Sequence, residues 1–68
     1  MNDDIFNMSV RKFLKAVGVR SQHEIEQAVT LAIASGKLKG NETLQAKMVL
    51  TVSGIDINVN FDDEIKLE

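Results

Sequence analysis

The sequence contains no cysteine and only one histidine. Without thiols, the chain cannot form disulfides, zinc–thiolate sites, iron–sulfur clusters or a thiol nucleophile, and a reducing, cytoplasmic compartment is favoured. No apolar run approaches the roughly 18 residues that a membrane span requires. The N-terminus carries Asp3 and Asp4 where a signal peptide would be basic. We therefore expect neither secretion nor insertion into a membrane.

The composition that remains is that of a globular chain. Hydrophobic residues at 44% and charged residues at 26% lie near globular averages, which predicts a folded protein. A chain of 68 residues has room for one small domain. For so short a chain, apolar burial and ordering entropy nearly cancel, and neither disulfides nor thiolate-bound metal can compensate. We therefore expect a homodimer or a complex with a small protein partner.

Apolar side chains recur at helical spacing in the first part of the chain and predict an amphipathic helix over about 4–17. Asn2 or Asp3 is the expected N-cap. Gly18 is expected to end this helix in a Schellman motif. The predicted apolar stripe is formed by Phe6, Val10, Phe13 and Val17 and is widened by Ile5, Leu14 and Ala16.

A second amphipathic helix is predicted over about 22–35. Ser21 and Glu24 have the spacing of a capping box, in which each side chain satisfies a free backbone N–H at the helix start. Gly36 is expected to end the helix at about Ser35. The stripe of this helix consists of Ile25, Ala28, Val29, Ala32 and Ile33.

Beyond residue 40 the apolar period changes from helical to two, which predicts strands over about 44–52 and 55–61. Ser53 and Gly54 form the expected two-residue turn of an antiparallel hairpin. A short third strand over 64–67 could follow. The predicted fold is α+β, with two amphipathic helices followed by the hairpin. In the predicted register, Val52 faces Ile55, Leu50 faces Ile57, Met48 faces Val59 and Ala46 faces Phe61.

Two patterns resemble metal-binding motifs but lack the residues that such motifs need. His23 begins a zinc-protease-like pattern, but Gln27 stands where the second histidine belongs. Asp56 begins a calcium-loop-like pattern, but Phe61 stands where the loop requires glycine. We therefore expect no catalytic, cofactor-binding or metal-binding residues, no cofactor and no enzymatic activity.

Charge is distributed unevenly along the chain. Residues 1–40 carry six basic and four acidic groups, a net charge of +2, whereas residues 41–68 carry two basic and six acidic groups, a net charge of −4. The basic part contains a candidate interaction patch, because its cations surround an apolar side chain that lies off the predicted stripe. The residues of this patch are Met8, Arg11, Lys12, Lys15, Lys37 and Lys39.

Two functions from different classes fit these features. The leading hypothesis is a non-enzymatic, self-associating protein-interaction module. The alternative is a nucleic-acid-associated regulator, because two helices followed by a hairpin are similar to a helix-turn-helix with a wing. The predicted recognition helix, however, has no Lys or Arg and carries Glu24 and Glu26, which phosphates would repel.

Three stretches of the chain resemble a family of small bacterial proteins grouped as a domain of unknown function. They are Phe6–Leu14, Gly18–Gln22 and Ser35–Leu44. The resemblance extends over nearly the whole chain, although Gln45 stands where the family pattern has proline. It implies a small stand-alone bacterial protein and assigns no activity to any residue.

Overall fold

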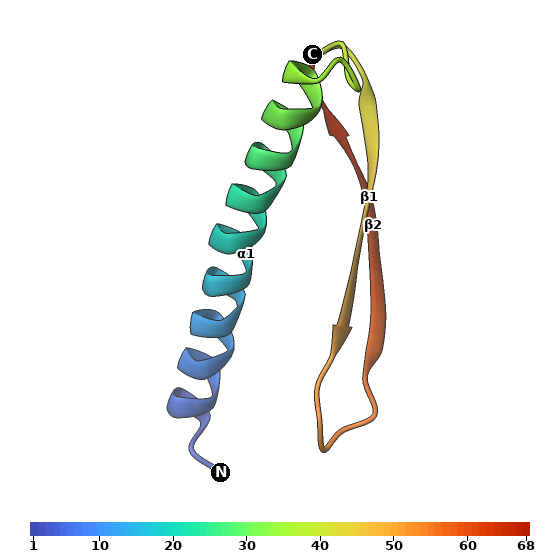
Figure 1. Cartoon of the computed structure of the whole chain (residues 1–68). Helices are drawn as coiled ribbons and strands as arrows, with labels where there is room; N and C mark the ends of the chain where they lie inside the picture. The colour runs from blue at the N-terminus through green and yellow to red at the C-terminus, as the bar shows by residue number, and fades with distance from the viewer. The chain divides into compact units, whose positions relative to one another are not determined.

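The computed structural model describes every residue of the chain and contains three elements (Figure 1). These are α1 (Asp3–Ala34), β1 (Thr43–Thr51) and β2 (Asn58–Lys66). The chain divides into two compact units, Met1–Lys37 with α1 and Leu38–Glu68 with the hairpin. The predicted α+β class is confirmed, but the structure has one helix where the sequence predicts two.

The predicted break at Gly18 is wrong, because α1 is one continuous helix of 32 residues (Figure 1). A glycine inside a helix costs about 1 kcal/mol relative to alanine. A break would instead leave several backbone N–H and C=O groups without helical partners. It would also interrupt the apolar stripe, which continues in phase from Val17 through Ser21 to Ile25. Ser21 is therefore not an N-cap, and the predicted capping box with Glu24 does not form.

The two ends of α1 lie where the sequence predicts them. Asn2 is the N-cap, and its side-chain oxygen accepts a hydrogen bond from the backbone N–H of Ile5 at 3.1 Å. Ser35 is the C-cap, and Gly36 follows with a φ of 81°. Only glycine adopts this left-handed conformation without strain, which explains why the helix ends there.

The hairpin is antiparallel, as predicted, but its turn and register differ from the prediction. Ser53 and Gly54 are part of a longer connection over 52–57, so the predicted two-residue turn is wrong. The register is shifted by two residues, and an even shift keeps each side chain on the same face of the sheet. The observed pairs on the apolar face are Leu44 with Ile65, Ala46 with Asp63, Met48 with Phe61 and Leu50 with Val59.

The separate third strand predicted over 64–67 does not exist, because β2 itself continues to Lys66. The observed register gives a ladder of nine residues on each strand, longer than the predicted one. It also places Lys47 directly opposite Asp62. A cross-strand pair of opposite charge contributes roughly 0.2–1 kcal/mol, so the longer ladder and this pair both favour the observed register.

No side chain in the chain is buried, whether hydrophobic or polar. The best-shielded side chains of α1 are only half-buried, and they include Val17, Val29 and Ala32. Leu44, Leu50 and Ile65 are half-buried in the hairpin unit. Each unit, taken by itself, therefore leaves its apolar side chains unburied.

Candidate functional site

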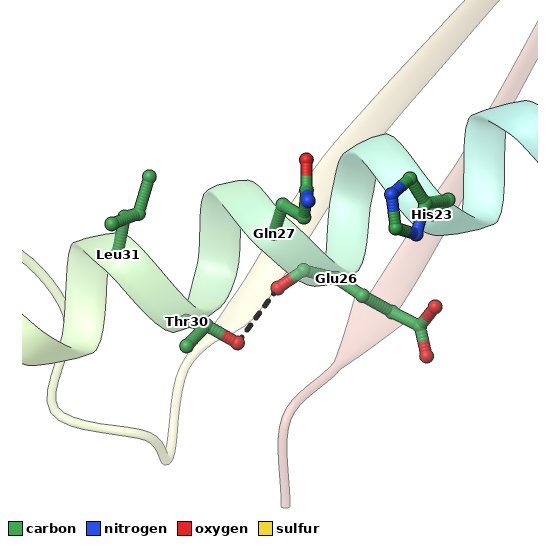
Figure 2. A pocket seen from close by; sticks show the side chains of 5 residues that line it. All are labelled: His23, Glu26, Gln27, Thr30 and Leu31. Atoms are coloured by element: carbon green, nitrogen blue, oxygen red, sulfur yellow. Dashed lines mark hydrogen bonds between the residues drawn. The ribbon is translucent and has the colours of Figure 1, made fainter.

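One shallow, open concavity lies along a single face of α1 (Figure 2). Its lining residues come from successive turns of the same helix, so it is a groove between side chains and not an enclosed cavity. The lining residues are His23, Glu26, Gln27, Thr30 and Leu31.

The polar groups of this groove are not arranged as a catalytic pair. The Thr30 hydroxyl donates a hydrogen bond to the backbone carbonyl of Glu26 at 2.8 Å, the one side-chain hydrogen bond among the lining residues (Figure 2). Threonine inside a helix commonly bonds back in this way. An activated nucleophile needs a base within hydrogen-bond reach, and His23 is not bonded to this hydroxyl. The chain also contains no group of three or more His, Cys, Asp or Glu side chains that could hold a metal ion.

The predicted interaction patch is divided between the two units. Four of its members lie at helical spacing on one exposed face of α1: Met8, Arg11, Lys12 and Lys15. A second shallow concavity on this part of the helix is lined by Ile5, Met8, Ser9 and Lys12. Lys37 follows the end of α1, and that end lies about 28 Å along the helix axis from Lys15. Lys39 belongs to the hairpin unit.

The most extensive apolar feature of α1 is a stripe that continues past Gly18, where sequence reasoning divided it. Val29 and Ile33 flank this stripe, and the polar side chains of Ser21 and Glu24 lie on the same face. Two of its aromatic side chains, Phe6 and Phe13, are 51% and 52% exposed. The stripe is about 40 Å long. The members of the stripe recur every three or four residues both before and after Gly18. This spacing was the signal in the sequence that the helix continues through Gly18. We define the α1 stripe as Phe6, Val10, Phe13, Val17, Ser21, Ile25, Ala28 and Ala32.

The hairpin presents a second apolar surface, built from alternate residues of both strands. Phe61 is 55% exposed, and its cross-strand partner Met48 is 46% exposed. Asp63 lies on the same face, opposite Ala46, and is the one charged side chain within this otherwise apolar surface. We define the hairpin face as Leu44, Ala46, Met48, Leu50, Val59, Phe61 and Ile65.

These observations define a small α+β chain in which each of the two units, taken by itself, has an unburied apolar face. The whole chain, residues 1–68, matches the family of unknown function DUF6494, and the chain therefore belongs to that family. The resemblance to a family of unknown function, noted from the sequence, is thus confirmed. Comparison with curated proteins and with solved structures found no match. The helix of the chain is not apolar enough to cross a membrane.

Proposed function

We propose that the chain is a non-enzymatic protein-interaction module that associates with itself through its exposed apolar faces. The observation that carries this proposal is that neither unit buries any side chain within itself, while seventeen large hydrophobic side chains are at least 38% exposed. All three phenylalanines are among them. Soluble monomers rarely expose contiguous apolar surface on this scale, and large exposed patches mark interaction sites.

The architecture of each unit supports the same proposal. A two-stranded hairpin is only marginally stable in water by itself and needs an apolar partner for its face. Helices in proteins likewise gain most of their stability from packing of an amphipathic face. Each square ångström of apolar surface removed from water contributes about 25 cal/mol. A second copy supplies such surface without requiring any other protein.

Light scattering coupled to gel filtration tests the proposal when the chain is measured from low to tens of micromolar concentration. We expect a mass of about 15 kDa or a higher multiple of the 7.5 kDa chain at the upper concentrations. A mass of 7.5 kDa at every concentration would overturn the proposal.

Nucleic-acid binding is the second proposal, favoured by one observation. Arg11, Lys12 and Lys15 share one exposed face of α1, where they could contact phosphates. The helix-turn-helix on which this alternative was based is wrong, because Gly18 and Ser21 are helical. A gel shift at low salt that is lost in the triple variant R11Q/K12Q/K15Q would support binding. The absence of any shift at low salt would reject it.

A further inference from the structure

We infer that the α1 stripe binds the α1 stripe of a second copy running in the opposite direction, with the pair centred at the height of Val19. This inference rests on the proposed self-association and specifies which surfaces meet. It also fixes the register, because Phe6 of one copy then lies opposite Ala32 of the other. The evidence is the symmetry, the size pattern and the charge pattern of α1.

The α1 stripe is symmetric about Val19. Each of its members has a counterpart at the same distance on the other side of this residue. When two such helices run antiparallel about a two-fold axis at Val19, every stripe residue faces another stripe residue. The four facing pairs are Phe6 with Ala32, Val10 with Ala28, Phe13 with Ile25 and Val17 with Ser21.

Side-chain size favours the antiparallel direction. The large members Phe6 and Val10 meet the small members Ala32 and Ala28 of the second copy. Interiors pack densely when large and small residues alternate across facing positions. A parallel pair would instead place Phe6 against Phe6 and Ala32 against Ala32. It would be crowded at one end and under-packed at the other.

The spacing of the stripe allows contact along its whole length. Phe6, Val17 and Ala28 recur at an eleven-residue interval, close to the period of an undistorted helix. The stripe therefore remains on one face of α1 without strong supercoiling. Two copies can stay in contact over the roughly 40 Å of the stripe.

Charge on α1 also favours the antiparallel direction. Within α1, the residues before Val19 carry Arg11, Lys12 and Lys15 against Asp3 and Asp4, a net charge of +1. The residues after Val19 carry Glu24 and Glu26 against Arg20, a net charge of −1. An antiparallel pair places the positive half of each helix beside the negative half of the other. A parallel pair would place the basic segments beside each other, and the two helix dipoles would also repel.

Disulfide trapping tests this geometry, because the chain has no cysteine of its own. Val10→Cys and Ala28→Cys are made as separate variants, mixed in equal amounts and oxidised mildly. Covalent dimers are then identified by intact mass. We expect the mixed V10C–A28C disulfide in clear excess over both same-variant dimers. Two copies of Val10 would lie about 27 Å apart along the axis, far beyond disulfide reach.

A matched control uses Met8→Cys and Thr30→Cys, which lie at equal heights about Val19 but on the side of α1 away from the stripe. We expect this mixture to give no excess of the mixed dimer. A predominant V10C–V10C dimer, a random mixture of dimers or no covalent dimer would overturn the inference. If V10C loses helical circular dichroism, the pair Phe6→Cys and Ala32→Cys replaces the first pair with the same expectations.

The failure of this geometry is distinguishable from the failure of the proposed function. A light-scattering mass of about 15 kDa without the V10C–A28C excess would overturn the helix pairing and leave self-association in place. A mass of 7.5 kDa at every concentration would overturn both.

Discussion

Both carboxylate oxygens of Glu42 accept the backbone N–H of Lys39, at 3.1 and 2.8 Å. The N–H of Gly40 donates to the same carboxylate at 3.0 Å, and Gly40 has a φ of 104°, a conformation that favours glycine. The backbone carbonyl of Glu42 accepts the N–H of Leu67 at 3.0 Å. Glu42 therefore closes the connector that precedes β1 and also holds the chain that follows β2.

These hydrogen bonds predict that the stability of the hairpin unit depends on pH. The N–H groups of Lys39 and then Gly40 lower the pKa of Glu42 from its ordinary value of 4.5. Because the pKa is lower in the folded state, the carboxylate stabilises the fold fully above about pH 4.5 and loses its effect as the pH falls through the folded value. In urea denaturation from pH 7 to pH 3, Glu42→Gln should be less stable than wild type at pH 7. Its disadvantage should shrink in acid.

Glu68→Gln controls for the loss of one negative charge, since Glu68 is exposed and lies outside α1 and the connector. A constant difference between wild type and Glu42→Gln across this pH range would contradict the role of the carboxylate.

Gly18→Ala should stabilise α1 by about 1 kcal/mol, the usual advantage of alanine inside a helix. A Cβ built on Gly18 meets nothing within 4 Å, so no steric cost opposes the gain. Thermal melts followed by circular dichroism at 222 nm would measure the change. Gly36→Ala is the matched control and should destabilise the helix end, because Gly36 has a φ of 81°. A loss of stability in Gly18→Ala would mean that Gly18 ends a helix after all.

Ser21→Ala should not lower stability, because Ser21 is an interior residue of α1 and caps no helix. Asn2→Ala should cost about 1 kcal/mol, since it removes the bond to the N–H of Ile5. Chemical denaturation of both variants tests this ordering. The reverse ordering would place a helix start at Ser21.

The observed register makes Lys47 and Asp62 direct partners. Lys47→Glu should destabilise the hairpin by roughly 0.2–1 kcal/mol by placing like charges opposite each other, and the double variant K47E/D62K should recover the loss. A double-mutant cycle measures this coupling. In the register predicted from the sequence, Asn60 would face Lys47, and Asp62→Lys would then rescue nothing.

The ends of α1 and the two faces of the hairpin could be predicted because local chemistry decides them. Asn2 satisfies a free N–H at the start of the helix, and Gly36 takes the left-handed conformation at its end. The alternation of apolar and polar residues indicates which face of the sheet each strand residue occupies. A register shift by an even number of residues leaves that assignment unchanged.

The continuity of α1 and the register of the hairpin could not be predicted in the same way. Gly18 fits both a helix end and a helix interior, and only the stripe that extends from Val17 to Ile25 decides between them. Ser53 and Gly54 suit a tight turn locally, but the longer ladder that pairs Lys47 with Asp62 favours a wider loop. Of the candidate patch, Met8, Arg11, Lys12 and Lys15 share one face of α1, whereas Lys37 and Lys39 lie outside the helix.

The most direct test of the central claim, self-association through the α1 stripe, compares Val17→Glu with Val19→Glu by light scattering at one concentration. Val17 is a half-buried member of the stripe, whereas Val19 is 64% exposed and lies about 160° away around the helix axis. We expect Val17→Glu to have the 7.5 kDa mass of one chain and Val19→Glu to keep the wild-type mass of about 15 kDa. Equal masses for the two variants would contradict the claim.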